Sequence, residues 1–232
     1  MKSLPLIFLG VFFTLAFSWT GIVLTSHLQM KDLTPVTAEL VDKDDQPLGG
    51  GNYLVNGVTI KNTDGMTAYP LRAVGEAQRG KEVYEQMGCL YCHSQQVRRK
   101  GFGADFERGW GNRQSVARDY IEQDRVMLGT MRTGPDLTNV GLRYPELWQY
   151  QHIYNPQITS AGSTMPPYPF LFEVQTINEL TGPSIEALEL PANYHPGPGL
   201  EVIPTQRAKD LVSYLMSLNQ DYELPEIKFT EE

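Results

Sequence analysis

Two cysteines and a histidine stand close together in the segment Cys89-Leu90-Tyr91-Cys92-His93. The chain of 232 residues has no other cysteine, so the two thiols must act together. Cys-x-x-Cys-His is the attachment signature of c-type haem: both thiols form thioethers at one edge of the porphyrin, and the histidine places its imidazole under the iron as the proximal ligand. The motif therefore predicts one covalent haem on Cys89 and Cys92, with His93 on the iron.

Two other interpretations of a paired Cys-x-x-Cys are disfavoured. A zinc site needs two further Cys or His ligands at short spacing, whereas His27, His152 and His195 are widely scattered. A thioredoxin-like redox pair does not need the adjacent histidine and lies in a βαβ pattern, which this sequence lacks. The haem interpretation is therefore retained.

A second iron ligand is expected, because electron-carrying haems commonly use Met or another His opposite the proximal histidine. Met165 is the favoured candidate, since it lies in the loop-like segment Gly-Ser-Thr-Met-Pro-Pro-Tyr-Pro, whose prolines stiffen the backbone that presents the sulfur. Packing in a helical core accounts better for Met87, Met127 and Met216. The weaker alternatives are Met131, His152 and His195.

The chain begins with an uncharged apolar run. No charged residue occurs from Ser3 to Ser26, and these 24 residues span roughly 36 Å as a helix, enough to cross a hydrocarbon core of about 30 Å. A cleaved signal peptide is the alternative, but the apolar run continues well past the small residues near Ser18. We expect a transmembrane anchor over residues 1–28. Either interpretation places the rest of the chain outside the cytoplasm.

The segment that follows the anchor, residues 29–74, is rich in Gly, Asp, Asn and Thr. Within it, residues 53–60 indicate a small β-hairpin that turns at Asn56-Gly57. No chemistry-bearing group stands out here. We therefore expect a stalk with a candidate β-hairpin.

The main domain is expected over residues 75–222. It begins with a predicted helix at 75–88 and ends with an amphipathic helix at 205–218. Between them, residues 173–204 contain five prolines and are expected to form an irregular insertion. Residues 223–232 are expected to be a tail.

The charge balance excludes one class of partner. The net charge is −8 at pH 7, whereas a nucleic-acid-binding domain needs a basic face. Hydrophobic residues make up 41% and charged residues 20% of the chain. This composition is neither that of a disordered chain nor that of a polytopic membrane protein.

Five short segments occur in order along the chain: HSQQVR at 93–98, RTGPDL at 132–137, GLRY at 141–144, HIYNP at 152–156 and MPPYP at 165–169. Together they resemble the monohaem membrane-anchored subunit (subunit II, or O subunit) of cbb3-type cytochrome c oxidases. The combination is specific, whereas Cys-x-x-Cys-His alone is not.

The resemblance covers about residues 67–172 and the N-terminal helix. Residues 40–62 and 173–204 depart from the family pattern, so contacts made there cannot be carried over. The resemblance implies an all-α fold, namely a class I cytochrome c domain behind one N-terminal transmembrane helix, with loop-rich insertions.

The resemblance also implies roles for individual residues. In class I cytochromes c, the proline carbonyl of a Gly-Pro-x-Leu loop accepts the Nδ1 proton of the proximal histidine, which here assigns Pro135 to His93. Arg143, in the GLRY segment, is the favoured partner of a haem propionate; a solvated surface is the alternative for the other arginines. The expected haem-binding residues are Cys89, Cys92, His93, Met165, Pro135 and Arg143, and the iron ligands are His93 and Met165.

The implied function is electron transfer through a single haem c to the haem–copper subunit of a terminal oxidase, by a subunit that is not itself catalytic. Its expected partners are the haem–copper main subunit, another cytochrome c subunit or a soluble cytochrome donor, and the lipid membrane, with no nucleic acid. The expected location is the bacterial inner membrane, with a single pass and the haem domain on the periplasmic side. The alternatives are a free-standing anchored shuttle, the cytochrome subunit of a dehydrogenase, and a haem sensor with an open sixth position.

Overall fold

The computed structural model describes residues 3–39, 51–55, 58–62, 66–222, 224, 226 and 227. The chain separates into two compact units, Met1–Pro35 and Val36–Glu232. The expected turn at Asn56-Gly57 and most of the expected tail lie outside the described residues.

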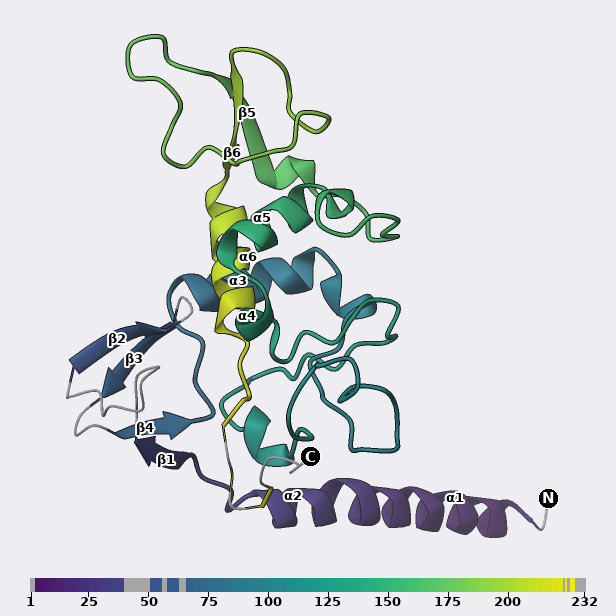
Figure 1. Ribbon diagram of the computed structural model, residues 1–232. Coiled ribbons are helices and arrows are strands. Elements are labelled where there is room, and N and C mark those ends of the chain that lie inside the picture. Colours follow the sequence, from purple (N-terminus) through teal and green to yellow (C-terminus); the bar gives the residue numbers. More distant parts are fainter. Residues whose placement is uncertain are drawn as a thin grey trace. The chain divides into compact units, whose positions relative to one another are not determined.

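The first unit is dominated by an apolar helix that extends from Leu4 to Met30 (Figure 1). It consists of α1 (Leu4–Ser18), a π-helical segment η1 (Trp19–Leu24) and α2 (Thr25–Met30). Its 27 residues correspond to about 40 Å at 1.5 Å per residue, which exceeds the hydrocarbon thickness of a bilayer. The helix is therefore long and apolar enough to cross a membrane.

The second unit combines short helices with two-stranded antiparallel sheets. Its described helices are α3 (Glu76–Gln86), η2 (Cys89–Tyr91), η3 (Ala117–Tyr120), α4 (Val140–Arg143), α5 (Glu146–Tyr154), η4 (Pro156–Ile158), η5 (Pro169–Leu171) and α6 (Gln206–Ser217). Its described strands pair as β1 (Val36–Glu39) with β4 (Met66–Tyr69), β2 (Gly51–Val55) with β3 (Val58–Asn62), and β5 (Phe172–Thr176) with β6 (Leu200–Pro204). These strands correct the expectation of an all-α fold.

The clearest departure from expectation is the segment 173–204, for which an irregular insertion was expected. Here β5 and β6 pair in register, with Val174 opposite Val202. Val202 is almost fully buried, and its carbonyl accepts a hydrogen bond of 2.8 Å from the backbone N–H of Leu188. Four of the five prolines lie in the connection between the strands and the fifth, Pro204, ends β6, so they do not interrupt the paired residues.

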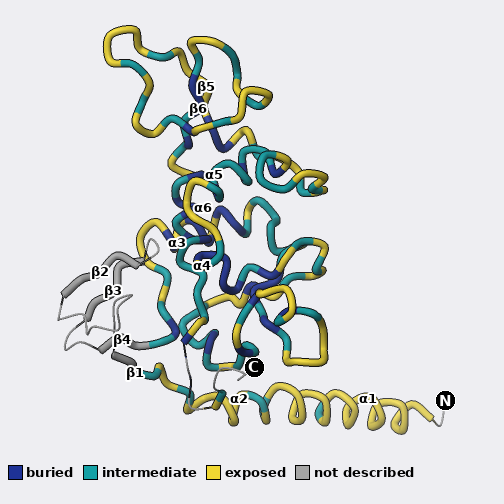
Figure 2. The backbone as a smooth tube through the Cα atoms, viewed as in Figure 1, coloured by how far each residue is buried: buried dark blue, intermediate teal, exposed yellow. Residues whose placement is uncertain are grey.

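The core of the second unit is the crossing of α3 and α6, where buried residues gather (Figures 1 and 2). A Cβ added to Gly80 would stand 1.9 Å from the carbonyl oxygen of Asp210 and 2.7 Å from Cβ of Tyr214. Only glycine therefore allows the two backbones to come this close. One turn after Gly80, Tyr84 packs edge-on against Tyr214, with 5.5 Å between the ring centroids. This crossing fixes the direction in which α3 delivers the chain to the cysteine motif.

Replacing Gly80 by alanine is expected to lower the free energy of unfolding by roughly 3 kcal/mol, at the upper end of the usual cost of overpacking. The new methyl group meets a backbone carbonyl, which cannot move away without shifting a whole helix. Denaturant unfolding of the full chain in detergent, followed by circular dichroism, measures the change. Glu82→Ala on the exposed face of the same helix is the control, and an equal effect of both substitutions would contradict the close crossing.

Candidate functional site

A cavity of about 510 Å³ lies in the second unit. Its wall is assembled from segments far apart in the sequence: the end of α3 and η2, the loop 133–137, helices α4 and α5, the loop 160–168, and α6. The fold brings all six residues of the expected site into this wall: Cys89, Cys92, His93, Pro135, Arg143 and Met165.

The cysteine motif follows directly after α3. The chain reverses at Gly88, whose φ of +73° lies in the left-handed region that favours glycine. The single turn η2 then directs Cys89, Cys92 and His93 toward the same cavity, and the backbone N–H of His93 donates to the carbonyl of Cys89 at 2.9 Å. Burial raises the pKa of the Cys89 thiol to about 11.

His93 is held in one tautomer. Its Nδ1 lies 2.8 Å from the carbonyl oxygen of Pro135, and because a carbonyl oxygen only accepts hydrogen bonds, Nδ1 carries the proton. Burial lowers the pKa of His93, although the hydrogen bond to Pro135 opposes this effect. The neutral ring therefore keeps a lone pair on Nε2, which is the arrangement of a metal-binding histidine.

The loop that carries Pro135 is fixed by a buried carboxylate. Asp136 is fully buried, and its oxygens accept hydrogen bonds from the backbone N–H groups of Gln96 at 3.0 Å and Thr138 at 2.9 Å. Arg132 forms ion pairs with Asp136 at 3.3 Å and with Asp105 at 3.0 Å. These contacts tie the Pro135 loop to the segment that follows the cysteine motif.

Asp136 and Arg132 were not singled out from the sequence, although both belong to the quoted RTGPDL segment. Nothing in the spacing of that segment indicates that its two charged residues would face the backbone of Gln96, just after the cysteine motif. Their role becomes visible only when the contacts with Gln96 and Asp105 are known.

Met165 reaches the cavity from the loop between η4 and η5. The loop is braced by Gln157, whose side chain accepts from the backbone N–H of Gly162 at 2.9 Å and donates to the carbonyl of Ser163 at 2.6 Å. The alternatives to Met165 are placed differently. Met131 is 56% exposed and, like His195, does not belong to the described cavity wall, whereas His152 does.

His152 ends a stack of three rings along α5. Tyr144 and Trp148 are 3.9 Å apart at their centroids, and Trp148 and His152 are 4.5 Å apart, with planes within 10° of parallel. Nδ1 of His152 also contacts the hydroxyl of Thr159 at 2.6 Å. The pKa of His152 is lowered to about 4, by burial and by the nearby His93. The stack forms a flat wall of the cavity.

Two buried nitrogen atoms in the cavity wall have no hydrogen-bond partner within the described residues: Nε of Arg143 and Nε2 of Gln149. Burial lowers the pKa of Arg143, and no carboxylate of the described chain pairs with it. Arg143 as a whole is half-buried, and withdrawing a cation from water without a counter-ion is costly. The wall therefore fits a large apolar group that carries an anionic acceptor, as haem does with its propionates.

Gln149 was not predicted from the sequence as a site residue. Gln149 is 3% exposed and follows Trp148 of the ring stack directly on α5. A glutamine among the aromatic residues of α5 was the sequence feature that could have indicated this position. The sequence alone does not show which face of α5 is buried.

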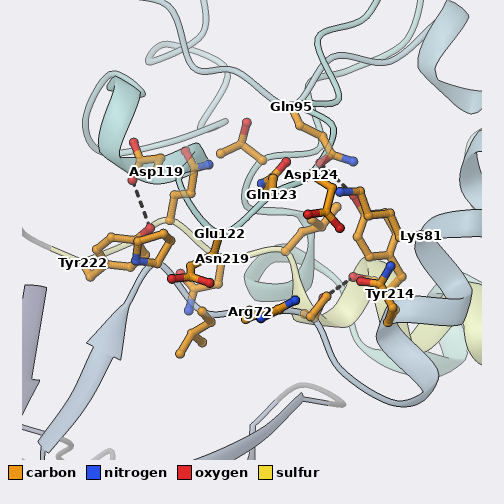
Figure 3. Close-up of a pocket in the computed structure, with 18 residues that line it drawn as sticks. Arg72, Lys81, Gln95, Asp119, Glu122, Gln123, Asp124, Tyr214, Asn219 and Tyr222 are labelled. Carbon is orange, nitrogen blue, oxygen red and sulfur yellow. Dashed lines mark hydrogen bonds between the residues drawn. The ribbon is translucent and has the colours of Figure 1, made fainter. Parts of the chain in front are cut away.

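A second cavity of about 60 Å³ shares no described lining residue with the first. Its polar wall includes Lys81, Gln95 and Gln123 (Figure 3). Here the hydroxyl of Tyr214 donates to Oε1 of Gln95 at 3.0 Å, while Gln95 Nε2 and Gln123 Oε1 have no protein partner in the described chain. The volume corresponds to about two water molecules, so this cavity is too small for a cofactor.

Replacing Gly134 by alanine is expected to disturb His93 specifically. A Cβ at this position would stand 2.3 Å from Cε1 and 2.7 Å from Nε2 of the imidazole, so the ring must tilt out of its present plane. Spectroscopy of the oxidised protein measures the change, which is expected as loss of a single low-spin species. Gly10→Ala is the matched control, because a Cβ there meets no atom within 4 Å. Identical spectra for wild type and Gly134→Ala would contradict the placement of the ring.

Residues 54–215, well over half of the chain, match the family described as cytochrome c oxidase, mono-heme subunit/FixO. A comparison with curated proteins found no match. The matched region contains the cavity and its six expected site residues, and the match confirms the resemblance drawn from the sequence. The chain belongs to the FixO family of mono-haem cytochrome c oxidase subunits, the family of the cbb3-type enzymes.

Proposed function

We propose that the chain carries one haem c on Cys89 and Cys92 and passes single electrons toward the haem–copper subunit of a cbb3-type oxidase. One observation supports this above the others: a single large cavity collects the two thiols, an imidazole with a free Nε2 and the thioether of Met165. The bound haem supplies the redox change, while the protein sets its ligation, burial and orientation.

In this proposal the residues that line the cavity have distinct roles. His93 and Met165 bind the iron, and Pro135 holds the proton of His93 on Nδ1. Arg143 and Gln149, whose buried Nε and Nε2 atoms have no hydrogen-bond partner in the described part of the chain, bind the propionates. Ligation by His and Met favours a relatively high potential, which suits a carrier that feeds an oxidase.

We also propose that residues 75–222 form a class I cytochrome c domain. The support is the crossing of α3 and α6 at Gly80 together with the position of the cysteine motif immediately after α3. In the family, the first and last helices cross at a small glycine with an aromatic ring beside it, and Tyr84 and Tyr214 supply such rings here.

The apolar helix Leu4–Met30 supports a membrane anchor, with the boundary at residue 28 and a stalk at 29–74 as drawn from the sequence. We propose a single pass through the bacterial inner membrane with the haem domain on the periplasmic side. Covalent attachment of haem c takes place on that side, as the family resemblance implies, and this agrees with the orientation.

Purification of the full chain in mild detergent tests the proposed function. We expect haem staining on this polypeptide and copurification of a large haem–copper subunit, identified by its mass. Recovery of the haem-stained chain alone would point to a free-standing shuttle, and recovery with a dehydrogenase would point to that class. Carbon monoxide binding to the reduced protein would indicate a sensor with an open iron position.

A further inference from the structure

The segment 172–204, here named the acidic arm, comprises β5, β6 and their long connection. Figure 1 shows it extending beyond α5 and α6. The arm contains five glutamates and no aspartate, lysine or arginine. Glu201 is buried, whereas the other four are exposed: Glu173, Glu179, Glu186 and Glu189. Only one of these four, Glu186, has an ion pair in the described chain, with Lys209 at 2.6 Å.

Two large apolar side chains project from the arm into solvent. Leu180 is 96% exposed and Ile185 is 102% exposed, the two highest values among the described large apolar residues of the domain. Leu180 is held by Asn178, whose side-chain oxygen accepts from the backbone N–H of Leu180 at 2.9 Å. The backbone N–H of Gly182 closes the same turn on the carbonyl of Asn178 at 2.8 Å.

The base of this loop is fastened by the buried Glu201. Its carboxylate accepts from the backbone N–H of Ser184 at 2.7 Å and from Nε2 of Gln175 at 2.8 Å. Ile185 follows Ser184 directly, so the carboxylate fixes the residue next to the exposed side chain. The two apolar side chains are therefore presented by an ordered support that makes its own hydrogen bonds.

We propose that the acidic arm is a docking element for a small soluble electron-carrier protein that has basic residues around an apolar patch. The exposed glutamates steer such a protein toward the arm, and Leu180 and Ile185 enter its apolar patch. This inference rests on the proposed function, because it names the class of protein that delivers electrons to the haem domain.

The charge of the acidic arm and the small size of its apolar contact favour a soluble electron carrier over other partners. The unbalanced carboxylates repel an anionic lipid surface, which attracts basic segments instead. Two protruding apolar side chains make a small contact, as expected for a transient electron-transfer encounter, whereas permanent subunit interfaces are larger and more hydrophobic. The arm also continues directly from the loop that carries Met165: Tyr168 lines the cavity and β5 starts at Phe172.

The test uses the purified oxidase complex and two soluble c-type cytochromes as electron-donor probes, one with a strongly basic and one with an acidic surface. Glu179→Lys with Glu189→Lys changes the arm's formal charge from −5 to −1, and Leu180→Ser with Ile185→Ser removes its apolar contact. The matched controls, both outside the arm, are Glu82→Lys, exposed on α3, and Phe102→Ser, which is 61% exposed. Oxygen consumption gives kcat and KM.

With the basic probe at low salt, we expect the charge variant to lower kcat/KM about tenfold. Added salt should reduce the wild-type value toward that of the variant, because it screens the steering. The apolar variant should raise KM at every salt concentration, while the two controls remain near wild type. The acidic probe should be a poor donor to the wild type and a better one to the charge variant.

Haem staining and turnover with a small uncharged dye as donor separate this proposal from the proposed function. Haem staining and turnover with the dye should be unchanged in every variant. If this chain carried no haem c, the wild-type complex itself would lack both. An unchanged kcat/KM with the basic probe in both arm variants overturns the docking proposal. Loss of another subunit from the purified arm variants also overturns it, because the arm would then be a permanent subunit interface.

Discussion

A chain in which Cys89 and Cys92 are both alanine is expected to carry no haem that survives denaturing gel electrophoresis. Only thioether bonds keep haem on an unfolded polypeptide, and the sequence offers no other thiol. Peroxidase staining of the gel, with the amount of protein measured on the same lane by immunoblotting, gives the result. Haem staining of the double variant at the wild-type level would disprove covalent attachment at this motif.

The same variant is expected to fold poorly. The cavity measures about 510 Å³, and leaving such a volume unfilled costs roughly 10 kcal/mol at about 24 cal/mol per Å³. That cost is comparable to the whole stability of an ordinary domain. Limited proteolysis compares the variants, and Tyr91→Ala is the control, because this residue lies between the cysteines, is 60% exposed and does not line the cavity.

Replacement of Met165 by alanine is expected to leave the haem attached but to change its iron coordination. Loss of the thioether leaves the iron high-spin or bound by another group, and the potential falls, because Met ligation raises it. The oxidised variant should lose the weak near-infrared absorption of a Met–iron bond, as the family resemblance implies. Absorption spectra and a redox titration of the purified protein measure both changes.

Met131→Ala is the matched control for this experiment, since Met131 is exposed and lies outside the described cavity wall. Its spectrum and potential should equal those of the wild type. If Met165→Ala behaves like the wild type instead, Met165 is not the ligand. His152, which shares the cavity wall, would then be the next residue to replace.

The sequence alone was sufficient to select candidate site residues where these residues lie in short segments with a local pattern. The segments around Cys89, Pro135 and Met165 each carry a local pattern, and the fold places all three in one cavity wall. Gly80 could be recognised as a helix-crossing residue only through the resemblance to class I cytochromes c, whose first and last helices cross at a small glycine. In these cases the residue type and its immediate neighbours already limit what the backbone can do.

The remaining features depend on contacts between distant segments. The cavity-facing position of Gln149 depends on which face of α5 is buried, and the contact between Asp136 and Gln96 joins residues 40 positions apart. The pairing of β5 with β6 could not be predicted from the sequence, because the prolines between the strands dominate the composition of residues 173–204. A short strand is specified largely by its partner, which local composition does not reveal.

The burial of Cys89 has a consequence for the order of events during biogenesis. Burial raises the pKa of this thiol, and the thiolate is the reactive form of cysteine, so the folded chain protects Cys89 from reaction. If haem c is attached as proposed, we expect the reaction to take place on the open chain, before the segment around Cys89 folds. An alkylating reagent should accordingly label Cys89 faster in the unfolded chain than in the folded chain without haem; equal rates in both states would refute this order. In the proposed function, the prosthetic group would then be a template around which the chain condenses.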